Sequence, residues 1–204
     1  MQGVDRPYHH GNLHRTLVEA AVRLARTGGP DAVVLRAVSR EAGVSHNAAY
    51  RHFVDRVDLL AAVSEVCMLQ LATLMAQRTA AVSVRARGPR ASARLNAVGR
   101  AYIEFARTEP GWFKTAFSGT PGGPKDSAEG EAAVGPFDLL SARLDELVEA
   151  DVLPAQRRPG AEFAAWSMVH GLSTLLIDGP LRFLPDPEVD ALITAVLDVV
   201  KRGL

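Results

Sequence analysis

The sequence predicts an all-α protein, and three observations support this fold class. Each long segment places its apolar residues three or four positions apart, which is the spacing of one face of an α-helix. Glycine and proline stand between these segments, where they end helices. The one hint of a strand is a run of four apolar residues at positions 32–35, Ala-Val-Val-Leu.

The first expected helix has its apolar face at Leu13, Leu17, Ala20, Ala21 and Leu24. Residues 27–30, Thr-Gly-Gly-Pro, end it, because glycine allows a left-handed exit and proline cannot continue a helix. Two short helices follow over residues 35–42 and 46–52. Gly43 supplies the turn between them, and Ser45 is well placed to cap the second.

Longer helices are expected from Asp55 onward. Asp55 can cap a helix that runs to about residue 81, and Asp58 suits the positive N-terminal end of that helix. The later helices are expected at about residues 91–108, 112–117, 136–151, 161–177 and 187–202. Residues 118–135 are rich in Gly, Pro, Asp and Ser, which predicts a loop, either disordered or a lid over a ligand.

Residues 35–53 have the pattern of a helix-turn-helix. Small or branched apolar residues let the two helices cross closely; they are Val38, Ala42, Val44 and Ala49. Gly43 permits the tight turn without a side-chain clash. The second helix then presents His46, Asn47, Ala48 and Arg51 outward, where they can enter a DNA major groove. The alternative is a coincidental helical hairpin.

Three residues of this helix suit contacts with base edges. Asn47 can pair with the N6 and N7 edge of adenine, and the methyl group of Ala48 suits thymine. His46 can donate to a guanine or to a phosphate.

Four further residues suit the phosphate backbone. Tyr50 and His52 each carry a donor on a rigid ring, although they could instead buttress the helix. Arg36 and Arg56 stand at the starts of their helices, where the charge adds to backbone N–H groups that face a phosphate.

Several spaced elements resemble the TetR/AcrR family of regulators, over about residues 8–64. The matching residues are Leu-Val-Glu-Ala-Ala at 17–21, Ala-Gly-Val-Ser at 42–45, Tyr-Arg-His-Phe at 50–53, and Asp-Arg at 55–56 leading to Asp-Leu-Leu at 58–60. Leu35 departs from the family's usual Ser or Thr cap, Ala49 from a common leucine, and Arg56 from the usual lysine.

The resemblance implies an N-terminal three-helix DNA-binding domain, joined by a long helix to a helical ligand-binding and dimerisation domain. It also implies a homodimer on a palindromic DNA operator, released by a small effector molecule. The DNA-facing set of the family falls on Arg36, His46, Asn47, Ala48, Tyr50, Arg51, His52 and Arg56. We expect the DNA-binding domain at residues 1–54 and the effector domain at 55–204.

The C-terminal part is similar to the Trp-His-Gly subgroup of the family through Trp166, His170 and Gly171. The candidate effector-pocket residues are Phe105, Trp112, Phe113, Phe117, Trp166 and His170. Ordinary core packing is the alternative for each of them. Two apolar helices, at 161–177 and 187–202, are expected to pair with their copies in a four-helix dimer interface.

Composition narrows the remaining possibilities. The formal net charge is zero, so charge alone does not indicate nucleic acid. The single Cys67 leaves no internal disulfide or Cys-rich zinc site, and it is expected in the core, with a redox sensor as the alternative.

No signal peptide or membrane span is evident, which favours the cytoplasm. No catalytic constellation, metal cluster or cofactor motif appears. We therefore do not expect an enzyme. The family resemblance implies a repressor, with an activator as the alternative, and the other candidate is a helical sensor without DNA binding.

Overall fold

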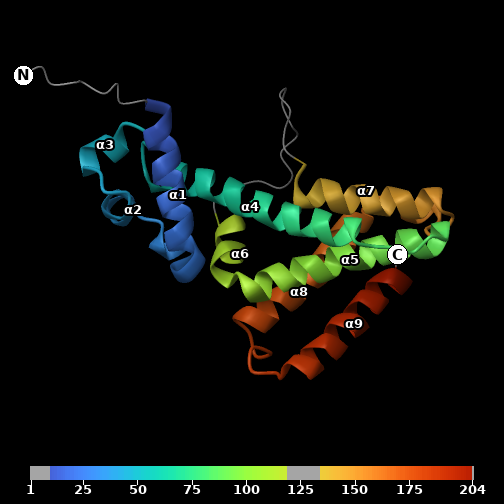
Figure 1. Cartoon of the computed structure of the whole chain (residues 1–204). Coiled ribbons are helices and arrows are strands. Elements are labelled where there is room, and N and C mark those ends of the chain that lie inside the picture. Colours follow the sequence, from blue (N-terminus) through green and yellow to red (C-terminus); the bar gives the residue numbers. More distant parts are fainter. Residues whose placement is uncertain (1–9, 119–133, 204) are drawn as a thin grey trace, which may run out of the picture. The chain divides into compact units, whose positions relative to one another are not determined.

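The computed structural model describes residues 10–118 and 134–203, and this part of the chain is helical with no strand (Figure 1). It divides into two compact units. Of the described residues, the first unit contains 10–67 and 111–118, and the second contains 68–110 and 134–203. The expected functional boundary between residues 54 and 55 therefore differs from this division, which falls inside the long helix.

The first unit is built from a helical N-terminal segment and one later helix. Its elements are α1 (His10–Gly28), the 3₁₀ turn η1 (Gly29–Ala32), α2 (Leu35–Glu41), α3 (His46–Tyr50), the first part of α4 (Arg56–Ala80) and α6 (Pro110–Ala116). Its core contains Leu17, Val33, Val38, Ala49, Phe53, Leu59 and Val63, each at most 2% exposed. Val33 and Phe53 lie between helices, and the other residues of this core lie on the helix faces expected from their spacing.

Short local signals set the geometry around α3. The Ser45 hydroxyl accepts from the backbone N–H of Ala48 at 3.2 Å and so caps α3. Gly43 has a φ of +68°, a conformation that glycine adopts at little cost. Asp55 accepts from the N–H of Asp58 at 2.9 Å, while the Asp58 carboxylate accepts from the N–H of Val54 at 3.1 Å. The expected caps of α3 and α4 are therefore confirmed.

Helix α6 packs closely against α1 within the first unit. The indole N–H of Trp112 donates to the carbonyl oxygen of Val22 at 2.8 Å. A Cβ on Gly111 would lie 2.2 Å from the Arg26 carbonyl oxygen, so only glycine allows this approach. On the α4 side, the Ser64 hydroxyl donates to the carbonyl oxygen of Ala116 at 2.7 Å. A segment distant in sequence thus belongs to the core of the first unit.

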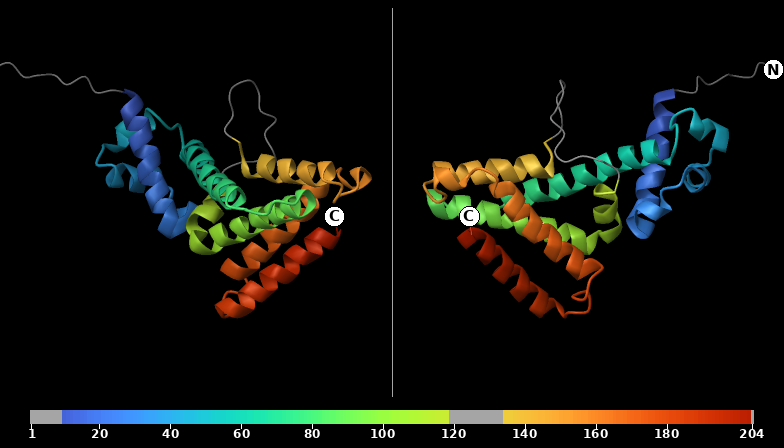
Figure 2. Two further views of the ribbon diagram at one scale, coloured as in Figure 1. Left: turned by 45° about the vertical axis from the view of Figure 1, so that its right-hand side comes forward. Right: turned by 180° about the vertical axis from the view of Figure 1, so that it is seen from behind.

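The second unit is organised around α5 (Arg87–Thr108), which contacts α7 (Pro136–Glu149), α8 (Ala161–Ile177) and α9 (Asp186–Gly203) (Figure 2). The turn η2 (Ala155–Arg157) precedes α8. Buried residues include Val98, Ile103, Leu144, Leu172 and Ile193. A Cβ on Gly99 would lie 2.5 Å from the Leu197 side chain, which shows how closely α9 approaches α5.

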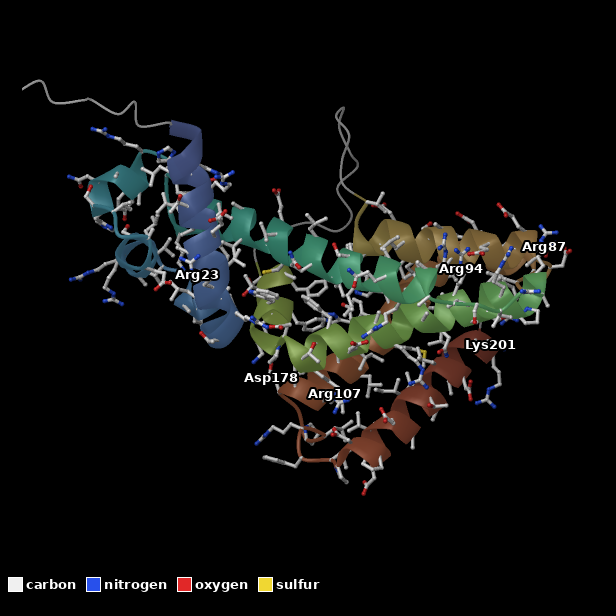
Figure 3. All side chains as sticks on the ribbon, viewed as in Figure 1. Arg23, Arg87, Arg94, Arg107, Asp178 and Lys201 are labelled. Carbon is white, nitrogen blue, oxygen red and sulfur yellow. The ribbon has the colours of Figure 1, made fainter. Side chains whose placement is uncertain are left out.

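Ion pairs tie the outer helices of the second unit to its centre. Arg94 of α5 donates to Glu146 of α7 at 2.8 Å, and Arg107 donates to Asp186 of α9 at 2.6 Å; both arginines are labelled in Figure 3. Arg158 donates to Asp145 at 2.7 Å and to Glu162 at 2.6 Å. Burial alone would raise the pKa of Glu162, but hydrogen bonds from its own backbone, from Arg158 and from Ser141 lower it, so the carboxylate stays charged.

Some sequence-based boundaries were wrong. The apolar run at 32–35 forms no strand: Ala32 ends η1, Val34 alone is clearly extended, and Leu35 begins α2. Helix α5 begins at Arg87 rather than near residue 91, since Pro89 lies in the first turn, where its missing N–H costs no helical hydrogen bond. Helix α3 ends at Tyr50. Most of the expected loop at 118–135 lies outside the described residues.

Helix α4 is the one described helix long and apolar enough to cross a membrane by length and composition. The core helix of a soluble protein can have the same composition. Leu59, Val63, Cys67 and Leu71 are fully buried within this fold, which accounts for the apolar character of α4.

Candidate nucleic-acid interface and effector site

Helix α3 has one buried and one exposed face. Ala49 is fully buried beneath the helix, whereas His46, Asn47 and Arg51 are exposed and Tyr50 is 49% exposed. Ala48 and His52 are partly exposed. His46, Asn47 and Tyr50 thus share the solvent side of one capped helix. Arg51 and His52 directly follow that helix, and Arg36 is exposed on α2.

Aromatic contacts orient two of these side chains. The rings of His46 and Tyr50, one helical turn apart, pack edge to face with centroids 4.7 Å apart. His52 lies near His14 of α1, with centroids 6.2 Å apart, and His14 stacks on the core residue Phe53 at 4.7 Å. His14 was not identified from the sequence, because nothing in the spacing links position 14 to positions 52 and 53.

The three arginines of the expected set differ in what they bind. Arg36 and Arg51 make no side-chain hydrogen bond or ion pair with the described part of the chain, so their charges face solvent. Arg56 is engaged. Its Nε donates to the carbonyl oxygen of Val33 at 3.0 Å, and its Nη2 donates to that of Pro30 at 2.7 Å.

One departure from the family pattern lies at the start of α2. Leu35, which stands where a capping Ser or Thr is usual, is 4% exposed and belongs to the core. The N-cap residue of α2 is Val34, whose apolar side chain makes no capping hydrogen bond.

The six candidate effector residues fall in both units. Trp112, Phe113 and Phe117 belong to the first unit, where Trp112 is held by Val22 and Arg26 lies 4.9 Å over its ring. Phe105, Trp166 and His170 belong to the second unit. The close approach of Gly111 to α1 explains why the aromatic residues of α6 group with the first unit.

Tyr102 joins Trp166 and His170, and sequence reasoning did not select it as a site residue. The Trp166 indole N–H donates to the Tyr102 hydroxyl oxygen at 3.1 Å, and that hydroxyl lies 2.7 Å from Nδ1 of His170. Burial raises the pKa of Tyr102 and lowers that of His170. A neutral His170 that accepts at Nδ1 from the tyrosine carries its proton on Nε2.

Cys67 is fully buried in α4, and burial raises the pKa of its thiol to about 12. A redox sensor requires an accessible thiolate, so the structure favours the core role. Among the described residues, no three His, Cys, Asp or Glu side chains lie close enough together to hold a metal ion.

Two family models match the chain. "Bacterial regulatory proteins, tetR family" matches residues 17–63, which include the helix-turn-helix. "Tetracyclin repressor-like, C-terminal domain" matches residues 95–200. The finer likeness to the Trp-His-Gly subgroup stays a prediction. No curated protein matches the chain.

Solved structures share the fold over nearly the whole chain. A protein of unknown function from Rhodococcus sp. RHA1 is 30% identical, with a TM-score of 0.72 and coverage of 98% of this chain and 99% of that one. TetR from Acinetobacter baumannii AYE is 17% identical, with a TM-score of 0.63 and coverage of 93% and 94%.

PfmR, a TetR family transcriptional regulator from Thermus thermophilus, is 21% identical, with a TM-score of 0.54 and coverage of 93% and 95%. The two family matches lie on the helix-turn-helix unit and on the helices built around α5. The chain therefore belongs to the TetR family of bacterial transcriptional regulators.

Proposed function

We propose that this protein is a sequence-specific repressor that binds a palindromic DNA operator as a homodimer and is released by a small effector molecule. The observation that carries the DNA-binding part is the solvent face of α3. It presents base-reading groups on His46 and Asn47, on a helix fixed by the Ser45 cap, and the unengaged charge of Arg51 lies at the C-terminal end of that helix. Such an arrangement suits a recognition helix in the major groove.

In this proposal the residues divide by role. His46, Asn47 and Ala48 contact base edges, and Arg36, Tyr50, Arg51 and His52 contact phosphates. Base contacts specify a sequence, whereas phosphate contacts give affinity that falls with salt. The cellular location is the cytoplasm, where the DNA target lies.

Selection from a random pool of duplexes tests DNA binding. We expect the purified protein to enrich one palindromic sequence whose half-sites lie about one helical turn, roughly 34 Å, apart. A pool without enrichment at moderate salt, with the protein folded and no ligand added, would contradict the proposal and favour a sensor that does not bind DNA.

The exposed apolar residues of α8 and α9 support the homodimer. Phe163 and Leu175 of α8 are 55% and 44% exposed, and Val199 of α9 is 47% exposed. A Cβ on Gly171 would meet nothing within 4 Å in this chain, so α8 offers a smooth surface for a close helix partner. Burial of these residues against their copies would remove apolar area from water.

Sedimentation tests the dimer. We expect the unaltered protein to sediment as a dimer at micromolar concentration, and Leu175→Glu to sediment as a folded monomer. Val84→Glu, which changes another 40% exposed apolar residue outside these helices, is the matched control and should stay dimeric. A monomeric unaltered protein, or a dimeric Leu175→Glu, would rule out this interface.

For the effector we propose a site beside Phe105, Trp166 and His170 in the second unit. The polar group of Tyr102 set among aromatic rings suits a mainly apolar molecule that carries a polar group. In this proposal, helix α6 transmits effector binding to the DNA-binding unit. It directly follows α5 of the second unit in sequence, and it packs on α1 of the first unit. An effector shifts the equilibrium only by its different affinity for the two forms.

A release assay tests the effector and the direction of control. Heat-treated, protein-free extract of the source cell is added to the complex with the selected duplex. A dialysable compound that frees the duplex supports the proposal, and Trp166→Ala should lower the response while basal DNA binding stays unchanged. In a reporter strain, higher expression without the protein indicates a repressor, and lower expression would indicate an activator.

A further inference from the structure

Resting on the proposed DNA binding, we propose that Arg56 is a positioning residue that holds the helix-turn-helix in place and does not contact DNA phosphate. Its guanidinium joins the start of α4 to the connection between α1 and α2. One side chain donates to two backbone carbonyl oxygens, of Pro30 at 2.7 Å and of Val33 at 3.0 Å.

These two carbonyl groups bracket the end of η1. Pro30 lies within the turn and Val33 follows it, and the Pro30 oxygen also accepts from the N–H of Val33 at 3.2 Å. Because the guanidinium donors have a fixed planar geometry, a single orientation of the side chain serves both carbonyls. Turning toward a phosphate with the same two groups would break both hydrogen bonds.

The two carbonyl groups lie at the entry to the recognition element. Val33 is fully buried, and α2 begins two residues later at Leu35. The backbone N–H of Val38 donates to the carbonyl oxygen of Val34 at 2.9 Å, within the first turn of α2. A shift of this connection therefore changes the direction of α2 and, through the turn at Gly43, of α3.

Charge does not explain the position of Arg56. A cation at the first residue of α4 faces the positive end of the helix, which is unfavourable. The neighbouring carboxylate of Asp31 is 3.8 Å away and fully exposed, so that pair contributes little. The carbonyl groups are the partners that hold the guanidinium here, and an arginine fork supplies what a lysine cannot.

The experiment compares Arg56→Lys and Arg56→Met with the unaltered protein and with Arg36→Met as control. The first measurement is amide hydrogen exchange without DNA. We expect faster exchange at Val33 and Val34 in both Arg56 variants, and no change in Arg36→Met. Unchanged exchange in the Arg56 variants overturns the proposal whether or not the protein binds DNA.

The second measurement is affinity for the selected duplex across a series of KCl concentrations. We expect both Arg56 variants to bind on the order of tenfold more weakly, with the slope of log K against log salt unchanged. Arg36→Met should instead reduce the slope by about 0.9 for each phosphate that the protein no longer neutralises. Full affinity in Arg56→Lys, or a reduced slope in Arg56→Met, overturns the positioning role. An unaltered protein that selects no duplex contradicts the proposed function instead.

Discussion

The indole N–H of Trp112 donates to the main-chain carbonyl oxygen of Val22 at 2.8 Å, which fastens α6 to α1 across 90 residues of sequence. Val22 lies within α1, before the C-terminal end of that helix at Gly28. Beside it, Arg26 lies 4.9 Å over the indole ring. The contact therefore combines a hydrogen bond with a cation–π interaction, and α6 belongs to the DNA-binding unit although it follows α5 directly.

Trp112→Phe should weaken this contact, because it removes the donor N–H and part of the ring system. A smaller aromatic ring replaces the indole near Arg26 and the N–H is lost, so we expect the free energy of unfolding to fall by at least about 1 kcal/mol. Urea unfolding measures this change. An unchanged midpoint would mean that the hydrogen bond contributes nothing to stability.

Gly111→Ala should be more harmful than Trp112→Phe. The new methyl group would lie 2.3 Å from the Ala25 carbonyl oxygen and 2.2 Å from that of Arg26, and these are backbone atoms that cannot turn aside. We expect a loss of about 1–3 kcal/mol, as for other overpacked sites. Thermal unfolding of both variants side by side gives the ranking, and a stabilised Gly111→Ala would refute the close approach.

Asn47→Ala should alter which sequence is bound. The side chain is exposed on α3 and can pair with the adenine edge. We expect base preference to relax at one position of each half-site, at a cost of about 1–3 kcal/mol there. Competition with duplexes changed one base pair at a time measures this preference. Equal weakening on every duplex would remove Asn47 from the base-reading set.

Tyr50→Phe serves as the matched contrast. It keeps the ring that packs on His46 at 4.7 Å and removes only the hydroxyl. If that hydroxyl binds phosphate, affinity for all duplexes should fall alike, by about 1 kcal/mol. A change confined to particular base pairs would instead link Tyr50 to sequence readout.

The local part of this architecture could be predicted from the sequence. The cap at Ser45, the turn at Gly43 and the buried position of Ala49 depend on residues within one or two helical turns, so spacing alone reveals them. For the same reason α8 was predicted with its correct limits, because Gly160 and Asp178 flank a continuous apolar segment.

Contacts between distant segments could not be predicted. The two carbonyl partners of Arg56 are main-chain atoms, which any sequence contains. Its position at a helix start and the family resemblance both predict a phosphate contact instead. Likewise, Trp112 donates to a main-chain oxygen of α1, so the residue type at position 22 does not indicate the contact. Tyr102 was missed because its partners lie more than sixty residues away on α8.

The pair formed by Tyr102 and His170 predicts how stability depends on pH. Burial lowers the pKa of His170 in the folded protein below its ordinary value of 6.5. The unfolded chain then binds more protons than the folded one as the pH falls through 6.5, so acidification favours unfolding. Protonation at Nδ1 would also remove the acceptor that faces the Tyr102 hydroxyl 2.7 Å away.

We therefore expect the free energy of unfolding to decrease as the pH is lowered from about 7.5 toward about 5.5, across the ordinary pKa of histidine. His170→Asn, which does not titrate in this range and keeps an acceptor, should show a smaller decrease. Urea unfolding at several pH values on both proteins isolates the difference, since the other titrating groups are common to both. Parallel curves would show that His170 does not contribute, and a steeper decrease in His170→Asn would reverse the sign argued here.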